Sequence, residues 1–216
     1  MMMQAVIPPF EGRGVWRADE RMGTGIMETV SAQGLSEDPT RVRIAATTLG
    51  DLLLSACDRA PDKEMLVFPE GRKTYGALVD AVLHKARALM ALGIGPGDHV
   101  GVLLPSGIAF VETLFANAMV GAVSVLMNAR YKAPEMAYVT DNADLVAIVT
   151  DDTSTPHVNF TGRLAEAFAD LAGQSDPAAL VLSSAPALRH IVVLRASDGT
   201  GSDSVASGFL GQDAFD

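Results

Sequence analysis

GPGDHVGVLLP, residues 95–105, is the stretch that decides the fold class of this chain. Its Gly-Pro-Gly-Asp start is a turn signal, and Pro105 closes the apolar run that follows. A continuous apolar run of this length is typical of a strand covered on both faces, as in a parallel sheet. The sequence therefore predicts a buried strand here, entered through a glycine-rich turn.

The residues on either side of this run predict helices. Before it, apolar residues recur every three or four positions from Tyr75 to Gly93, with charged residues on the other face. After it, a helical pattern runs from Ser106 to Gly121, and we expect Ser106 to cap that helix. Both glycines suit the left-handed conformation in which many helices end.

Helix and strand continue to alternate along the chain. A helix at 134–142 leads into the apolar run 145–149, and a further strand is expected at 190–194. Right-handed crossovers onto a mainly parallel sheet flanked by helices follow from this order, so the fold class is α/β. Ahead of these elements we expect a helix capped by Thr48 and a β-hairpin within 65–74.

The two ends of the chain lack such patterns. Residues 1–45 are rich in Gly, Pro, Arg and Glu and show no sustained period, which predicts a flexible leader. Residues 46–195 are expected to form the folded part. The Ser-, Gly- and Asp-rich residues 196–216 are expected to be a disordered tail.

Composition narrows the class of partner. A hydrophobic content of 49% is sufficient for a buried core, and the formal net charge of -10 argues against binding to nucleic acid or to an anionic membrane. The first ten residues lack the basic and apolar regions of a signal peptide. The apolar stretch 108–127 contains Glu112 and Asn117, so we interpret it as a buried helix running into a strand.

Cysteine and histidine offer no redox or metal chemistry. The single cysteine, Cys57, cannot form an internal disulfide and fits a reducing, cytoplasmic location. The four histidines are scattered along the sequence, so no metal site is predicted.

Several glycine- or acid-rich segments mimic functional motifs. The glycines at 93–97 follow a helix and open a strand, which is the reverse of a dinucleotide-binding loop. The loop 198–202 has no lysine after it and carries acidic residues that would repel phosphate. An unrelated nucleotide-binding domain would need a glycine-rich loop between a strand and a helix, which we do not find. Asp151 and Asp152 follow a strand, where they can face a ligand or form a solvated turn, and we favour the turn.

Three segments resemble motifs of the AMP-forming acyl-CoA synthetases, in the order and spacing of that family. Lys73-Thr74-Tyr75-Gly76-Ala77-Leu78 resembles its early T-Y-x-E-L motif, and residues 95–105 resemble its G-D-x-V-A run ending in proline. Residues 119–136, which include Asn128-Ala129-Arg130-Tyr131, resemble its N-P-R-Y-x-x-x-E-L run. The resemblance spans about residues 48–150 and implies an incomplete N-terminal subdomain of an adenylate-forming enzyme.

Family members use ATP, with Mg²⁺, to convert a carboxylic acid to an acyl-adenylate and then transfer the acyl group to coenzyme A. The resemblance implies this chemistry for the parent protein, with a fatty acid as the expected substrate and alicyclic and aromatic acids left open. The expected partners are therefore the acid, ATP and coenzyme A.

The chain departs from the family in what it lacks. The family's Ser/Thr/Gly-rich phosphate loop ending in Pro-Lys-Gly is absent, and residues 133–216 contain no lysine. Cationic side chains stabilise the charge on a transferring phosphoryl or adenylyl group. We therefore expect the chain to be an N-terminal piece that binds no cofactor tightly and is inactive alone, and we assign no catalytic residue.

Arg130 is the one residue that carries a functional expectation. It matches the arginine of the N-P-R motif, which lies near the coenzyme A nucleotide in some family members, and a guanidinium suits phosphate. The alternative is a structural pair with Glu135. Tyr75, Asn128 and Tyr131 are expected to be structural.

A second hypothesis treats the chain as a non-catalytic protein-interaction module derived from the family. An open sheet edge and uncovered apolar faces would then bind a protein partner or a second copy. It predicts discrete oligomers, whereas a broken fragment would aggregate.

Overall fold

The computed structural model describes residues 14–18, 25–29, 48–153, 158–195 and 207–212. The chain divides into two units, residues 1–43 and 44–216. In the first unit, β1 (Gly14–Ala18) pairs with β2 (Gly25–Thr29) as an antiparallel hairpin. The rest of the predicted flexible leader lies outside the described residues.

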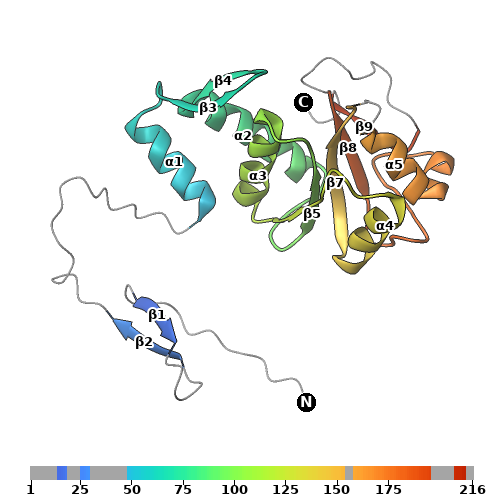
Figure 1. The fold of residues 1–216 in the computed structure, drawn as a ribbon, viewed down its shortest axis with the longest axis horizontal. Coiled ribbons are helices and arrows are strands. Elements are labelled where there is room, and N and C mark those ends of the chain that lie inside the picture. The colour runs from blue at the N-terminus through green and yellow to red at the C-terminus, as the bar shows by residue number, and fades with distance from the viewer. Residues whose placement is uncertain (1–13, 19–24, 30–47, 154–157, 196–206, 213–216) are drawn as a thin grey trace. The chain divides into compact units, whose positions relative to one another are not determined.

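The second unit is built on a five-stranded parallel sheet, which confirms the predicted α/β class (Figure 1). The strand order is β6-β5-β7-β8-β9. The strands are β5 (His99–Leu103), β6 (Val123–Leu126), β7 (Leu145–Asp151), β8 (His190–Leu194) and β9 (Leu210–Gly211).

Helices cover both faces of this sheet. One face packs against α2 (Tyr75–Ala91) and α3 (Ile108–Val120), through a core that includes Val100, Val102 and Val149. The other packs against α4 (Ala133–Asn142) and α5 (Phe160–Ala167), with Phe160, Leu164 and Ile148 fully buried. After α5 a short 3₁₀ helix, η2 (Ala169–Gly173), precedes β8.

The middle of β5 approaches its neighbours too closely for a side chain. A Cβ placed on Gly101 would lie 2.8 Å from Leu145 Cδ1, 3.0 Å from Met127 Sδ and 3.2 Å from Ile148 Cγ1. Real Cβ atoms are essentially never found at the shortest of these distances. The bare backbone of β5 is therefore a packing surface for the α4 and α5 side of the sheet.

A smaller core joins the elements that precede the sheet. It contains Leu53 of α1 (Leu49–Arg59), Leu66 of β3 (Glu64–Phe68) and Leu78, Val79 and Val82 of α2. The strand β4 (Gly71–Thr74) pairs with β3 as the predicted hairpin.

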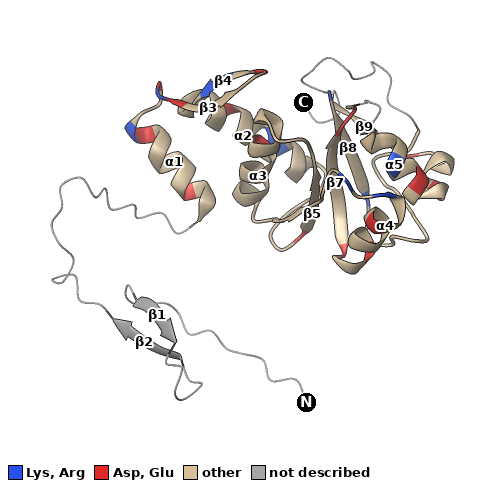
Figure 2. Cartoon of the chain, viewed as in Figure 1, with Lys and Arg blue, Asp and Glu red and all other residues tan. Residues whose placement is uncertain are grey.

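One buried carboxylate links three of these elements. Glu112 of α3 is 6% exposed, and its oxygens lie 2.6 Å from Lys73 Nζ of β4 and 3.5 Å from Lys85 Nζ of α2. Figure 2 shows α3 as otherwise almost uncharged, so this acid is an exception on an apolar helix. No described helix is long and apolar enough to span a membrane.

Helix ends follow the predictions in most places. Thr48 Oγ1 accepts from the amide of Asp51 at 3.0 Å, and Gly93 and Gly121 adopt φ values of +75° and +78°. The prediction that Ser106 caps α3 is wrong. The N-cap residue is Gly107, which has no side chain to cap the helix.

The predicted disordered tail also needs correction at 207–212. Phe209 and Leu210 are 6% and 8% exposed, and Leu210–Gly211 joins the sheet beside β8. Two consecutive apolar residues of this polar segment are buried against the folded unit, beside β8. The composition of the segment does not predict this burial. The other tail residues lie outside the described ranges.

His190 stands at the start of β8 and is only 5% exposed. Its Nε2 lies 3.0 Å from the carbonyl oxygen of Leu92, so this nitrogen carries the proton and donates it. Its Nδ1 is buried and has no hydrogen-bond partner among the described residues. Burial lowers the pKa of His190, since a second proton would place an unpaired charge in the core.

Gly101→Ala is expected to destabilise the folded unit by about 1–3 kcal/mol because the added methyl group must displace side chains in a packed core. Urea unfolding followed by circular dichroism measures this. Gly95→Ala is the matched control, since a Cβ at Gly95 meets nothing within 4 Å. Equal stability of the two variants would contradict the close packing at β5.

The lowered pKa of His190 predicts a pH dependence of stability. The unfolded chain takes up a proton near pH 6.5 while the folded chain resists it, so the contribution is complete above about pH 6.5 and is lost as pH falls. The slope reaches at most about 1.4 kcal/mol per pH unit.

Urea titrations between pH 5 and 8 test this. His190→Gln, which keeps a donor for Leu92, is expected to flatten the slope, and His84→Gln, which changes an exposed histidine, is the control. An unchanged slope in His190→Gln would rule out the buried neutral imidazole as the cause.

Candidate functional site

The strand order creates a crevice at the carboxyl ends of β5 and β7. These strands are neighbours, yet α3 carries the chain from β5 to β6 on one side and α5 carries it from β7 to β8 on the other. The two connections therefore diverge from this point. In open α/β sheets, ligands bind where adjacent connections diverge in this way.

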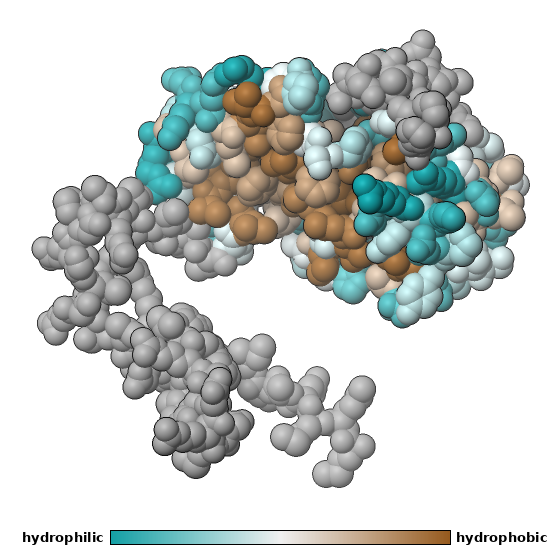
Figure 3. Space-filling view, viewed as in Figure 1, coloured by the Kyte–Doolittle hydropathy of each residue, from teal (hydrophilic) through white to brown (hydrophobic). Residues whose placement is uncertain are grey.

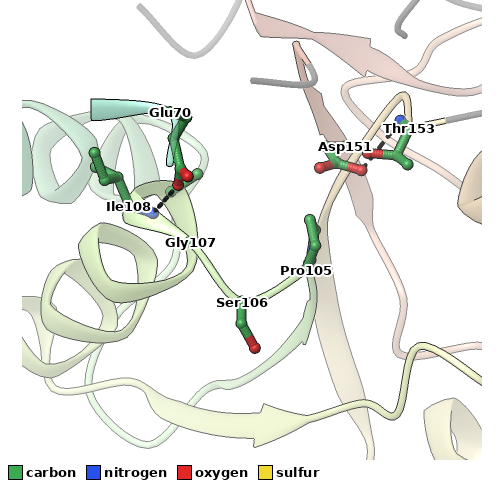
Figure 4. A pocket seen from close by; sticks show the side chains of 8 residues that line it. Glu70, Pro105, Ser106, Gly107, Ile108, Asp151 and Thr153 are labelled. Atoms are coloured by element: carbon green, nitrogen blue, oxygen red, sulfur yellow. Dashed lines mark hydrogen bonds between the residues drawn. The ribbon is translucent and has the colours of Figure 1, made fainter. Parts of the chain in front are cut away.

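A pocket of about 180 Å³ occupies this position (Figure 4). Three segments line it: the turn between β3 and β4, the loop after β5 and the end of β7. The lining residues are Glu70, Pro105, Ser106, Gly107, Ile108, Ala109, Asp151 and Thr153.

Glu70 closes the N-terminus of α3 from outside the helix. Its Oε1 accepts from the amide of Ile108 at 2.9 Å, across 38 residues of sequence (Figure 4). A Cβ on Gly107 would lie 2.6 Å from the same oxygen, so a larger residue there would have to displace the Glu70 carboxylate. A carboxylate is thus already bound where the helix dipole favours an anion.

Asp151 is a buried acid, which corrects the predicted solvated turn. Its side chain is at the end of β7 and the residue is 4% exposed, with Oδ1 accepting from the amide of Thr153 at 3.1 Å. The neighbouring Thr150 donates its hydroxyl to the carbonyl of Leu103 at 2.9 Å and ties the ends of β7 and β5 together. Sequence analysis missed this burial because β7 extends two residues beyond its apolar run.

The described lining of this pocket is unfavourable for the phosphates of ATP. Among the described residues it contains two carboxylates and neither Lys nor Arg, and Glu70 already occupies the amide of Ile108 at the start of α3. Phosphate binding requires cationic side chains or free amides. Within the described ranges, no three His, Cys, Asp or Glu side chains gather as a metal site.

The predicted binding residue, Arg130, also lies beyond the carboxyl ends of the strands, but outside the pocket. It is an exposed residue in the turn that follows β6, and it is not among the residues that line the pocket. Its amide donates to Asn128 Oδ1 at 2.9 Å, which gives Asn128 the structural role expected for it.

The alternative pairing of Arg130 with Glu135 is not formed. Glu135 Oε2 instead accepts from the amide of Lys132 at 2.8 Å and caps α4. In the described part of the chain, no ion pair involves the Arg130 guanidinium. The Arg130 side chain is exposed to solvent and can bind an anion.

Sequence analysis missed the residue that holds this turn. Arg163 of α5 donates from Nη1 to the carbonyl of Ala129 at 2.8 Å and to that of Tyr131 at 3.2 Å. It therefore brackets Arg130 from a position more than thirty residues later. No local pattern marks such a contact, since it depends on how α5 packs beside α4.

Similarity to known proteins identifies the family of this chain. The AMP-binding enzyme family matches residues 53–202. The putative acyl-CoA synthetase YngI of Bacillus subtilis is 34% identical over 109 residues, covering 50% of this chain and 20% of its own length. A Mycobacterium marinum ligase for medium/long-chain fatty acids and 3-oxocholest-4-en-26-oate is 33% identical over 104 residues, covering 48% and 19%.

A solved structure shares the fold. The anthranilate CoA ligase AuaEII in complex with anthranoyl-AMP superimposes with a TM-score of 0.61 at 20% identity, over 81% of this chain and 28% of that one. The chain thus spans about a fifth of the length of the curated relatives named above. Since the family match covers well over half of its residues, the chain belongs to the AMP-binding enzyme family.

Proposed function

We propose that this chain forms the first part of an AMP-forming acid–CoA ligase. The parent enzyme would activate a carboxylic acid with Mg·ATP to an acyl-adenylate and transfer the acyl group to coenzyme A. The observation that carries this proposal is the family match over residues 53–202, and the likeness to acyl-CoA ligases supports it. A fatty acid is the proposed substrate, since one relative is named for such acids, and the proposed location is the cytoplasm.

The 216-residue chain alone is proposed not to adenylate. Its last lysine is Lys132, and the pocket at the carboxyl ends of β5 and β7 presents carboxylates where a triphosphate would need cations. The phosphate loop of the family would have to come from sequence beyond this chain.

Arg130 is proposed to meet the nucleotide end of coenzyme A. Its side chain is exposed, its backbone is fixed by Asn128, and Arg163 holds the two flanking carbonyls. A fixed turn lowers the entropic cost of presenting a guanidinium to a phosphate, which it can bind in two-pronged fashion. Arg163 acts here as a positioning residue.

A second candidate function is supported by the open edge of the sheet. β6 is the outermost strand on its side, with Val123 and Leu126 exposed at 46% and 57%. On the face that Figure 3 shows, apolar surface gathers around α3. Phe110 and Leu114 of that helix are only partly buried. Such surfaces favour association with a protein partner, as a non-catalytic interaction module requires.

We expect the 216-residue chain to show no octanoate-dependent exchange of pyrophosphate into ATP. A gene extended through the nucleotides beyond the codon for Asp216 is expected to encode a Ser/Thr/Gly-rich loop ending in Pro-Lys-Gly, and its product to catalyse the exchange. Acid-dependent exchange by the short chain would overturn the proposed inactivity. A downstream sequence without that loop, together with a discrete oligomer in light scattering, would favour the interaction module.

In the extended enzyme, Arg130→Ala is expected to raise the KM for coenzyme A about tenfold, since one charge-assisted contact to phosphate is lost. Pyrophosphate exchange, which precedes coenzyme A binding, is expected to stay within twofold. Arg87→Ala, an exposed arginine on α2, is the matched control. Equal effects of the two variants, or a loss confined to pyrophosphate exchange, would remove Arg130 from the coenzyme A site.

A further inference from the structure

The outer edge of β6 presents backbone hydrogen-bonding groups that point away from the sheet. β6 is the outermost strand on its side of the described sheet, and β5 is its neighbour. The amides of Val123 and Met127 donate toward β5 at 2.8 and 3.0 Å, so every second residue of this strand directs its backbone groups inward. Ser124 and Leu126, which alternate with them, therefore direct their amides and carbonyls outward.

This edge lacks the features that usually discourage strand pairing. Charged side chains, prolines and bulges keep the sheet edges of many proteins apart. β6 reads Val-Ser-Val-Leu, and residues 113–129 contain no Asp, Glu, Lys or Arg. Two copies of a chain with a net charge of -10 repel each other, and the repulsion is weakest where no charge is present. This stretch is therefore a place where two identical chains can approach each other closely.

A second copy of the chain offers a matching edge when a two-fold axis normal to the sheet relates the two. Such an axis sets β6 antiparallel to its copy and keeps each face of the sheet on its own side. With the axis at Val125, Ser124 of each copy lies opposite Leu126 of the other. Since both residues direct their backbone groups outward, each such pair exchanges two hydrogen bonds. An axis at Ser124 would instead pair Leu126 with Ala122, which lies outside β6.

The side chains agree with this register on both faces of the sheet. Ser124 Oγ accepts from Asn117 of α3 at 2.9 Å, so Ser124 and Leu126 lie on the α3 face. There the small Ser124 leaves room for Leu126 of the other copy, which is 57% exposed in the single chain and loses apolar surface to the contact. On the α4 and α5 face, Val125 lies directly opposite Val125 of the second copy, where two β-branched side chains can pack.

We propose that β6 pairs antiparallel with β6 of a second copy of this chain, with the two-fold axis at Val125. The two five-stranded sheets then join into one. This inference rests on the interaction module, the second candidate function, and names a second copy as its partner. It does not involve the adenylation chemistry of the first candidate.

Sedimentation equilibrium of the 216-residue chain tests the association, and a dimer is expected. Leu126→Lys adds a charge to the edge beside its symmetry-related copy, and is expected to raise the dissociation constant at least about tenfold. Val181→Lys is the matched control, because Val181 is 79% exposed and the change in net charge is the same. It is expected to leave the dissociation constant within about twofold.

The outcomes separate this inference from the function on which it rests. A dimer that Leu126→Lys leaves intact would overturn pairing at β6 and keep the interaction module. A parent chain that stays monomeric at about 100 µM would also overturn the pairing, and would leave the module only with a different protein as its partner. Aggregates without a defined mass would indicate a broken fragment and overturn both.

Disulfide crosslinking tests the register in a Cys57→Ser background. Val125→Cys lies opposite its own copy and is expected to form an intermolecular disulfide under mild oxidation. Val123→Cys is the control, since it lies opposite Met127 of the second copy and about 13 Å along the strand from its own counterpart. That separation exceeds the reach of a disulfide, although Val123 is 46% exposed.

A disulfide that forms equally at both positions, or at neither, would overturn the two-fold axis at Val125. Circular dichroism verifies that each variant is folded. Should Leu126→Lys fail to fold, the comparison of the two cysteine variants decides the outcome.

Discussion

The placement of β5 between β6 and β7 is the constraint on which the rest of this structure depends. A strand with parallel neighbours on both sides and helices on both faces can present only apolar groups or bare backbone. Gly101 answers this demand on the α4 and α5 side, where Leu145, Met127 and Ile148 leave no room for a methyl group. The position of β5 also forces the chain to leave for β6 and return past it to β7, which opens the crevice at the carboxyl edge.

That edge is held by contacts between segments far apart in the sequence. Glu70 binds the amide of Ile108, Thr150 binds the carbonyl of Leu103, and Arg163 binds the carbonyls on either side of Arg130. In each case a side chain satisfies a backbone group that secondary structure leaves open. The result separates charge along the edge, with carboxylates at β5 and β7 and an exposed guanidinium after β6.

The sequence predicted the elements better than it predicted their ends. Hydrophobic period and glycine positions identified α2, β5 and α3 because these signals are local. Ser106 was expected to cap α3 since capping is usually local too, whereas the helix takes its cap from Glu70. Asp151 looked like part of a solvated turn, because nothing nearby in sequence indicates that β7 extends to include it. Similarly, β9 depends on an edge that exists only once β8 is in place.

Glu112 couples the docking of the β3–β4 hairpin, α2 and α3 during folding. Its carboxylate is 6% exposed and meets lysines from β4 and from α2. Burying a carboxylate is unfavourable until its partners are in place, and these partners come from two different elements. The hairpin, α2 and α3 therefore gain this interaction only by docking together, so a partly docked hairpin is disfavoured. One acid on an apolar helix thus makes the assembly of three elements cooperative.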